Sequence, residues 1–460
     1  MHKTLHITTY GCQMNVYDTQ RIEEMLTVLG YVLSTKMDAD IAIFNTCQIR
    51  EKAEEKLFSD LGRVRLLKEQ RKESGKQMTI VVAGCSAQAL GGHILKRAPY
   101  VDLVVGPQTY DKLPELLAKI ERARISGVGP GQGILGIGFP KISKFDKLNV
   151  PRGFHGVSAM LSIQEGCNKF CTYCVVPYTR GAEYSRPLED ILKEAQNLLK
   201  QGAKELTLLG QNVNAYSSQS PKGNTVTFSE LLYRCAELEG LFRLRYMTSH
   251  PREMTQSLIQ AHKEIPQLMP FLHLPVQSGS NRVLQEMNRQ YTILEYETIL
   301  ENLREARPDI AFSSDFIVGH PGESEEDFEQ TCQLAARVGY SQAYSFMYSA
   351  RPGTPSALKS QLPFEIKQHR LYRLQEILHK SQLAFNISKQ GTCLPVLLEK
   401  KGKKTGQLLG KTPYMQSVYV QASPELIGSI QWVEIQQGYN NSLAGSLKNR
   451  ACYSLNNTVQ

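Results

Sequence analysis

The chain has 460 residues, which fits two or three domains, and its hydrophobic fraction of 41% is ample for ordinary cores. No apolar run approaches the ~20 residues that a bilayer crossing needs, and no signal-like apolar stretch follows the first residues. These features argue against a membrane or secreted protein. We therefore expect a cytoplasmic protein with reduced thiols, in which clustered cysteines indicate metal binding or catalysis. The net charge of +9 suits a polyanionic partner.

Apolar runs alternate with helical patterns over the first 120 residues. Strands are predicted at 6–10, 41–44, 79–83 and 101–105, and helical periodicity appears at Ile22, Met25, Leu26 and Leu29 and again at Ala53, Leu57, Leu61 and Val64. This alternation predicts a parallel sheet, in which the loops after the strands share one edge. Cys12, Cys47 and Cys85 each follow a strand. We expect a metal site at that edge, although three unrelated buried thiols would also fit.

A flexible connector is predicted at 122–152. Residues 131–136 match the pattern G-x-G-x-x-G. A dinucleotide fingerprint needs a strand before it and a helix after it. Here a charged helix end precedes the glycines, and Gly138 with Pro140 disfavours a helix after them. We predict no nucleotide site in the connector.

Three cysteines lie close together in residues 166–174, with the spacing C-x-x-x-C-x-x-C, after a predicted strand at 159–163. A [4Fe–4S] cluster held by Cys167, Cys171 and Cys174 would keep one iron open for another ligand. A structural zinc site closes with four ligands, usually as two pairs, and no second pair follows within 60 residues. An odd number of cysteines without a secretory context argues against a disulfide knot. The loop therefore predicts an iron–sulfur cluster.

Six strand–helix units follow one another between 153 and 383, which predicts an incomplete parallel barrel. Polar residues gather after its strands, where barrels place their sites. Each one alone is better explained as a turn former or cap, but together they suit a polar cofactor. After residue 385, short strands at 394–398, 417–420 and 432–435 predict a small β-barrel. A lysine run at 400–404 is either a solvated loop or a nucleic-acid contact.

The cysteine loop resembles that of the radical-SAM superfamily, in which S-adenosylmethionine (SAM) chelates the open iron. Over nearly the whole chain, the motifs are similar to those of the methylthiotransferase family. They are YGCQMN at 10–15, NTC at 45–47, GC at 84–85, the loop at 166–181, GQNVN at 210–214 and RPGTP at 351–355. Residues 13–15 and 177–180 favour the MiaB subgroup, which methylthiolates C2 of N6-isopentenyladenosine at position 37 of tRNA. His320 departs from the family, where an aromatic residue is expected.

The resemblance implies an α/β N-terminal domain at 1–121, a linker at 122–152, a radical-SAM (β/α)6 half barrel at 153–383 and a TRAM RNA-binding barrel at 386–454. It implies that Cys167, Cys171 and Cys174 hold the radical-SAM cluster. Cys12, Cys47 and Cys85 would hold a second [4Fe–4S] cluster that carries the sulfur. One SAM would methylate that sulfur, and another would supply the radical that activates the base. Contacts to SAM are expected from Tyr173, Gly210, Gln211 and Asn212.

The implied partners are the anticodon stem-loop of an isopentenylated tRNA, an electron donor such as a flavodoxin or ferredoxin, and a sulfur source. A monomer without membrane association is expected. One open alternative is a sister methylthiotransferase acting on threonylcarbamoyladenosine in tRNA or on a ribosomal-protein aspartate. Others are a non-catalytic iron–sulfur RNA-binding protein and a zinc-dependent one. Cys235, Cys332, Cys393 and Cys452 are expected to be buried thiols outside both sites.

Overall fold

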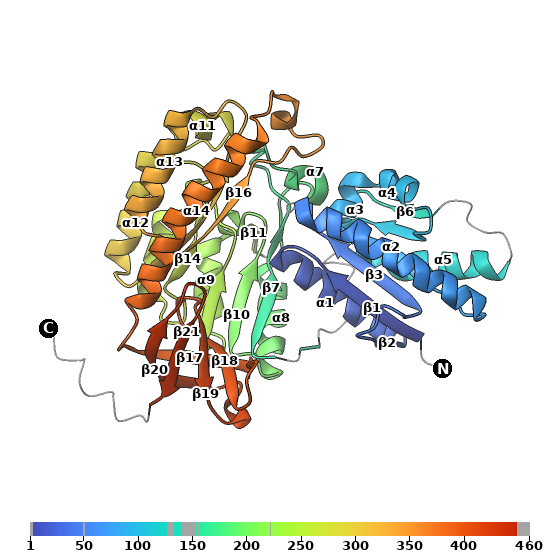
Figure 1. Cartoon of the computed structure of the whole chain (residues 1–460). Coiled ribbons are helices and arrows are strands. Elements are labelled where there is room, and N and C mark those ends of the chain that lie inside the picture. Colours follow the sequence, from blue (N-terminus) through green and yellow to red (C-terminus); the bar gives the residue numbers. More distant parts are fainter. Residues whose placement is uncertain are drawn as a thin grey trace.

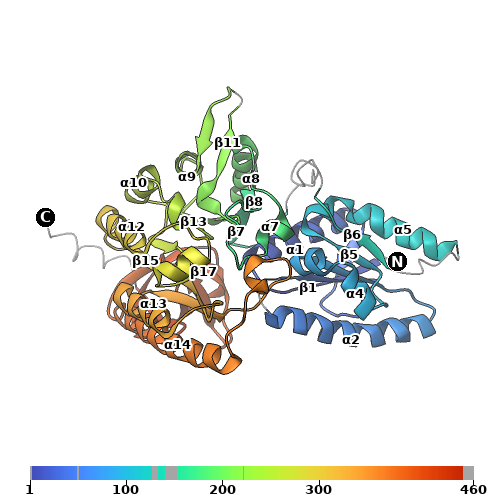
Figure 2. The same cartoon turned by 90° about the horizontal axis from the view of Figure 1, so that it is seen from above.

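The computed structural model describes residues 3–48, 51–126, 133–139, 153–154, 156–220 and 222–448. Figure 1 shows an N-terminal α/β part beside a central half barrel, with a small C-terminal barrel below one end of the half barrel. Figure 2 shows the same arrangement from above. None of the described helices combines the length and the apolar composition that a bilayer crossing requires.

The N-terminal part is one parallel six-stranded sheet with the strand order β2-β1-β3-β4-β5-β6. Its strands are β1 (Lys3–Thr9), β2 (Tyr31–Leu33), β3 (Ile41–Thr46), β4 (Thr79–Gly84), β5 (Leu103–Val105) and β6 (Ile134–Gly136). The helices are α1 (Gln13–Val28), α2 (Glu51–Glu73), α3 (Cys85–Leu90), α4 (Gly92–Arg97) and α5 (Leu113–Ile125). Every residue of β3 and β4 is buried, because central parallel strands are covered on both faces.

The four predicted strands of this part are confirmed, whereas β2 and β6 were not predicted. The prediction of a connector at 122–152 is wrong for 122–125, which continue α5, and for 134–136, which pair with β5 as β6. The partly buried side chain of Ile134 packs on the hydrophobic core of the sheet. This packing stabilises the short segment as an edge strand beside β5. Residues 127–132 and 140–152 lie outside the described residues.

The central part contains the six expected strand–helix units. Its strands form two parallel three-stranded sheets, β13-β10-β7 and β14-β15-β16. They are β7 (Ser158–Ser162), β10 (Glu205–Leu209), β13 (Arg243–Tyr246), β14 (Phe271–His273), β15 (Ala311–Val318) and β16 (Gln342–Met347). A parallel bridge between Leu244 and Leu268 joins the two sheets.

Helices cover the outside of these sheets (Figure 2). They are α8 (Leu188–Lys200), α9 (Phe228–Ala236), α10 (Gln256–Glu264), α11 (Asn281–Glu286), α12 (Ile293–Ala306), α13 (Glu325–Val338) and α14 (Phe364–Ile387). Smaller elements are α7 (Val176–Arg180) and the antiparallel pairs β8 (Gln164–Glu165) with β9 (Tyr184–Ser185) and β11 (Ser217–Gln219) with β12 (Thr225–Thr227). A capping box formed by Ser324 and Asp327 begins α13.

The C-terminal part is a closed barrel with the strand order β17-β18-β19-β21-β20. Its strands are β17 (Cys393–Lys401), β18 (Gln407–Lys411), β19 (Ser417–Gln421), β20 (Ile430–Gly438) and β21 (Leu443–Leu447), of which β18 and β21 were not predicted. Buried Arg243 and Arg245 at the start of β13 dock this barrel. Arg243 donates to the carbonyls of Lys411 and Pro395 at 2.8 and 2.6 Å, and Arg245 donates to those of Pro413 and Thr412 at 2.7 and 2.9 Å. The barrel therefore sits at the end of the half barrel opposite the carboxyl ends of the strands.

Candidate active site

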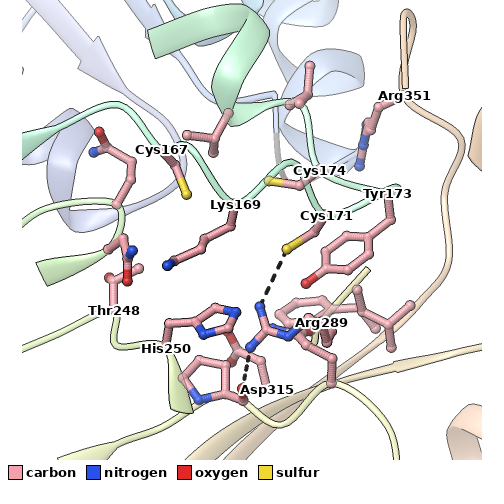
Figure 3. A pocket seen from close by; sticks show the side chains of 18 of the residues that line it. Cys167, Lys169, Cys171, Tyr173, Cys174, Thr248, His250, Arg289, Asp315 and Arg351 are labelled. Carbon is pink, nitrogen blue, oxygen red and sulfur yellow. Dashed lines mark hydrogen bonds between the residues drawn. The ribbon is translucent and has the colours of Figure 1, made fainter. Parts of the chain in front are cut away.

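The three cysteines at 167–174 line a cavity of about 250 Å³ at the carboxyl ends of the half-barrel strands (Figure 3). Gly166 begins the loop with a φ of 77°, and a Cβ there would stand 2.0 Å from the carbonyl oxygen of Ala182, so only glycine fits. Burial raises the pKa of the Cys167 thiol to about 11 and that of Cys174 to about 12. Buried thiols of this kind hold their protons at neutral pH until a metal replaces them.

Four residues that line this cavity carry buried polar atoms without a hydrogen-bond partner among the described residues. Gln211 Nε2, Asn212 Oδ1, Ser249 Oγ and His250 Nε2 belong to residues that line it, are buried and have no hydrogen-bond partner in the described part of the chain. Buried polar groups nearly always have partners in folded proteins. The lining therefore fits a ligand rich in donors and acceptors, such as SAM.

His250 is a neutral donor on the cavity wall. Burial, reinforced by the positive charges of Arg289, Lys169 and Arg252, lowers its pKa to about 2. Its Nδ1 accepts a hydrogen bond from the backbone N–H of Arg252 at 3.3 Å, so the ring proton belongs on Nε2. This Nε2–H has no hydrogen-bond acceptor among the described residues.

Strained backbone gathers around the same cavity. Thr248 and Gln277, which line it, have φ values of 71° and 75°, and Phe170 in the cysteine loop has 47°. For a β-branched residue such as threonine, a positive φ is a genuine outlier. Such strain persists where the surrounding structure fixes a functional geometry.

The predicted SAM contacts divide into two groups. Tyr173, Gln211 and Asn212 line the cavity, whereas Gly210 is not part of its lining. A Cβ on Gly210 would stand 2.5 Å from Gln164 Oε1. This oxygen accepts the backbone N–H groups of Gln211 and Asn212 at 2.9 and 3.1 Å. Gly210 therefore acts indirectly, by letting Gln164 fix the backbone of its two neighbours.

Sequence reasoning missed Arg289, which has no motif of its own. Its buried guanidinium donates from Nη1 to Cys171 Sγ at 3.6 Å and from Nη2 to the Pro275 carbonyl at 2.8 Å, as the dashed lines in Figure 3 show. Its Nε donates to the Tyr291 hydroxyl at 3.0 Å. No signal in the sequence marks this contact, because Arg289 follows a short helix rather than a strand. Gln164 was also missed, although it comes two residues after the end of β7, where barrels place site residues.

His320, the departure from the family pattern, is connected to the cysteine loop. The buried His320 Nε2 lies 2.9 Å from Ser356 Oγ, which donates to Thr172 Oγ1 at 2.8 Å. The Ser356 N–H also donates to the carbonyl of Thr172 at 2.9 Å. Thr172 lies between two of the cysteines, so these hydrogen bonds through Ser356 help to hold the cysteine loop in place.

The structure also brings Cys12, Cys47 and Cys85 together at one edge of the N-terminal sheet. They follow the neighbouring strands β1, β3 and β4, and the thiols of Cys12 and Cys47 are hydrogen-bonded. A Cβ on Gly11 would stand 2.1 Å from Cys47 Cβ, and a Cβ on Gly84 would stand 2.3 Å from the carbonyl oxygen of Thr46. Both glycines have positive φ values, 102° and 96°, so the glycines before Cys12 and Cys85 are required for the close approach.

Arg180, at the end of α7, links this second triplet to the half barrel. Its Nε donates to Cys85 Sγ at 3.4 Å, and its other nitrogens pair with Glu165 at 2.9 Å and Asp18 at 2.7 Å. All four side chains are buried. Burial raises the pKa of the Cys85 thiol. Arg180 lies within the loop motif at 166–181, but no sequence pattern indicates its contact with Cys85.

The donor chemistry of the two triplets fits iron–sulfur clusters. In the part of the chain that the structure describes, no three His, Cys, Asp or Glu side chains converge tightly enough for a single metal ion. A cluster of four irons is wider than one ion and takes thiolates as its ligands. Two sets of three thiols match that requirement better than a closed zinc site, which takes four protein ligands.

Three family models match the chain. The radical SAM superfamily matches residues 161–335, an uncharacterized protein family, UPF0004, matches residues 4–106, and the TRAM domain matches residues 388–448. The matched ranges fall in the half barrel, the N-terminal sheet and the C-terminal barrel, respectively.

Curated relatives are similar over nearly their full length. A tRNA-2-methylthio-N(6)-dimethylallyladenosine synthase of Maricaulis maris is 52% identical over 451 residues, which cover 97% of each chain. The protein of the same name from Wolbachia pipientis subsp. Culex pipiens is 53% identical, covering 96% of this chain and 99% of its own.

Two solved structures share the fold at low sequence identity. The radical SAM methyltransferase TsrM of Kitasatospora setae has a TM-score of 0.54 at 14% identity, covering 78% of this chain and 74% of its own. The cobalamin-dependent radical enzyme OxsB has a TM-score of 0.52 at 13% identity, covering 82% of this chain and 56% of its own. This similarity concerns the fold alone.

Proposed function

The chain belongs to the family of tRNA-2-methylthio-N(6)-dimethylallyladenosine synthases, and from this we propose that it methylthiolates C2 of N6-isopentenyladenosine at position 37 of tRNA. It is a radical-SAM enzyme that modifies tRNA. The observation that carries the proposal furthest is a cavity lined by the three cysteines together with four residues whose buried polar atoms have no hydrogen-bond partner among the described residues.

We assign the radical-SAM cluster to Cys167, Cys171 and Cys174. When bound there, the cluster supplies the electron that cleaves SAM. Gln211, Asn212, Ser249 and His250 offer the hydrogen bonds that would orient SAM, with His250 Nε2 as a donor. Tyr173 fills the cavity wall beside Cys171 (Figure 3). Holding the reacting groups in one geometry is the protein's main contribution to such chemistry.

We assign a second cluster to Cys12, Cys47 and Cys85. This group would supply the sulfur that is transferred. Three thiols from three neighbouring strands support the assignment, because they leave one iron of a cubane open. Buried Arg180 belongs to the half barrel and touches Cys85 of the sheet, so the two sites are held in one arrangement.

The apolar part of the cavity suits the isopentenyl group. Ile317 and Phe346 are register partners on β15 and β16, and both line the cavity. Asp315 also lines the cavity, two residues before Ile317 on β15, and its register partner is Tyr344. Ile317 and Phe346 supply apolar surface that an isopentenyl group can contact and that offers a threonylcarbamoyl carboxylate no hydrogen bond. The wall therefore supports an apolar substituent on the adenine.

Binding of the tRNA would involve the C-terminal barrel. Lys400, Lys401, Lys403 and Lys404 are exposed at the β17–β18 hairpin, and such basic surfaces contact phosphates. We further propose that the protein acts as a cytoplasmic monomer, with an electron donor such as a flavodoxin or ferredoxin and an external sulfur source.

Nucleoside mass spectrometry tests the reaction and the substrate together. Protein reconstituted without oxygen is incubated with SAM, a reductant and isopentenylated tRNA, and the digested nucleosides are analysed. The proposal expects a methylthio mass gain on isopentenyladenosine and none on tRNA that lacks the isopentenyl group. A gain only with threonylcarbamoylated tRNA or ribosomes would assign the chain to a sister class. Colourless protein carrying zinc would instead support a zinc-dependent RNA-binding protein.

A further inference from the structure

Each cysteine triplet has one buried arginine that donates to one of its thiols. Arg289 reaches Cys171 at 3.6 Å, and Arg180 reaches Cys85 at 3.4 Å. Both guanidinium groups are almost fully buried. Since arginine stays protonated in proteins, each one places a permanent positive charge beside its site.

The two arginines differ in what balances their charge. Arg180 pairs with two buried carboxylates, those of Asp18 and Glu165. The contacts of Arg289 are a hydroxyl, a carbonyl and a thiol, all neutral, and it makes no ion pair with a carboxylate of the described chain. The charges in direct contact therefore sum to negative beside Cys85 and to positive beside Cys171.

Other charged groups along the cavity do not reverse this difference. Lys169 is paired with Glu253. Asp315 adds a carboxylate to the lining, 3.5 Å from a ring nitrogen of His273, and Arg351 adds a guanidinium. Counted over each arginine and its direct contacts, the charge stays positive beside Cys171 and negative beside Cys85.

This difference in local charge should produce a difference in reduction potential between the two clusters. Reduction adds an electron to a cluster, so an unbalanced positive charge nearby favours the reduced state, and nearby carboxylates oppose it. Net charge and hydrogen bonds to the sulfurs are the features by which proteins set cluster potentials. Both effects are strong at buried positions, where water screens little.

We propose that Arg289 and Arg180 are positioning residues that set the order of reduction: the cluster on Cys167, Cys171 and Cys174 accepts an electron before the cluster on Cys12, Cys47 and Cys85. This inference rests on the two clusters of the proposed function. In that enzyme, the order directs the donor's electron to the site that cleaves SAM and keeps the sulfur-carrying site oxidised.

An anaerobic redox titration of the full-length protein with both clusters tests the order. Electron paramagnetic resonance follows each cluster, and the signal that changes when SAM is added identifies the cluster on Cys167, Cys171 and Cys174. That signal is expected to appear at the higher potential. Appearance of the other signal first, or of both together, would overturn the inference. A product assay on the same sample shows separately whether the proposed reaction occurs.

Substitutions then test the two residues. Arg289→Met should shift the first cluster to a more negative potential, and Arg289→Lys, which retains the charge, should shift it less. Glu165→Gln removes one carboxylate beside Arg180 and should shift the second cluster to a more positive potential. At a potential that half-reduces the first cluster, the reduced fraction of the second cluster should be larger in Glu165→Gln than in the unsubstituted protein.

Arg337→Met is the matched control, because Arg337 is an exposed arginine on α13 that pairs with Glu297. It should leave both potentials unchanged. Equal shifts in the control and in Arg289→Met would contradict the proposal, as would an unchanged second cluster in Glu165→Gln. If Arg289→Met does not retain iron, Arg289→Lys and Glu165→Gln still decide the question.

Discussion

The two cysteine triplets reach similar arrangements by different routes. Cys167, Cys171 and Cys174 share one loop, so their spacing alone brings them together. Cys12, Cys47 and Cys85 lie on three loops, and only the neighbouring positions of β1, β3 and β4 assemble them. The first site is therefore formed by residues close in sequence, whereas the second depends on the order of the strands in the sheet. It follows that the second site should be the more sensitive to changes in backbone packing.

Gly11→Ala should have the largest effect and should break the second site alone. The new Cβ would overlap Cys47 Cβ at 2.1 Å, and the φ of 102° is unfavourable for alanine. Strain and overpacking together should cost roughly 2–5 kcal/mol. We expect loss of the second cluster and of the methylthiolated product, while 5′-deoxyadenosine is still formed from SAM. Iron analysis and product assays measure these outcomes.

Gly30→Ala is the control for this substitution. Gly30 lies in the same part of the fold with a φ of 88°, but a Cβ there would meet nothing within 4 Å. The strain alone should cost about 1–2 kcal/mol, with full iron content. Equal loss of iron in both variants would show that backbone strain, rather than the contact with Cys47, explains the result.

Acid should weaken the half barrel before the N-terminal sheet. Burial lowers the pKa of His250 to about 2, of His262 to about 3 and of His320 to about 4, and all three lie in the half barrel. Between these values and the ordinary 6.5, the unfolded chain binds protons that the folded chain does not. The contribution of each neutral histidine to the free energy of unfolding is therefore fully present above pH 6.5. It is lost as the pH falls, by roughly 2 kcal/mol per histidine at pH 5.

Urea midpoints measured by circular dichroism between pH 7 and pH 5 check this dependence. His262→Gln should remove one of the protons taken up on unfolding, so the urea midpoint should fall less steeply as the pH decreases. His262 suits this test because it lies on α10 and its ring hydrogen-bonds to Tyr246 rather than to a residue of either site. Limited digestion with pepsin should cut the half barrel first. An N-terminal sheet that is cut as fast as the half barrel at each pH would count against the distinction. No histidine is buried among the described residues of that sheet.

Phe346→Ser should reduce substrate selectivity at the cavity. Loss of an apolar contact to the isopentenyl group should lower kcat/KM for isopentenylated tRNA by about 10–200-fold, the usual range for such pockets. Formation of 5′-deoxyadenosine from SAM alone should change less. Phe364→Ser is the matched control, because Phe364 is an exposed phenylalanine at the start of α14 that does not line the cavity. Equal losses in the two variants would remove Phe346 from the substrate site.

Replacement of the four lysines at 400–404 by alanine should have the smallest effect on chemistry. It should weaken tRNA binding, most strongly at low salt, because each lost phosphate contact lowers the slope of log affinity against log salt by about 0.9. Both clusters and SAM cleavage should be unchanged. Filter binding over a salt series measures the slope, and an unaltered slope would exclude these lysines from the RNA contact.

The sequence predicted those parts of the molecule that depend on local pattern. Long apolar runs identified β3 and β4, and the close spacing of the cysteines identified the loop at 166–174. Three-residue strands such as β2 and β6 were missed, because so short a segment has no period of its own and is stabilised only by its neighbour.

The contacts that complete the two sites depend on tertiary structure. Arg180 reaches Cys85, and Arg289 reaches Cys171, across about a hundred residues of chain. The pattern of one sequence does not reveal such pairs. The second triplet was predicted only because parallel sheets place their loops at a common edge, and its role as a cluster site was implied by the family resemblance.

The separation of the two sites can be measured directly by following 5′-deoxyadenosine and the methylthiolated nucleoside in the same reaction. Cys85→Ala is expected to retain SAM cleavage and lose the methylthiolated product, whereas Cys171→Ala should lose both and keep the iron of the second site. Cys393→Ser, outside both triplets, should keep both. Formation of the methylthiolated nucleoside by Cys85→Ala would contradict the account, because sulfur transfer would then not depend on the second triplet.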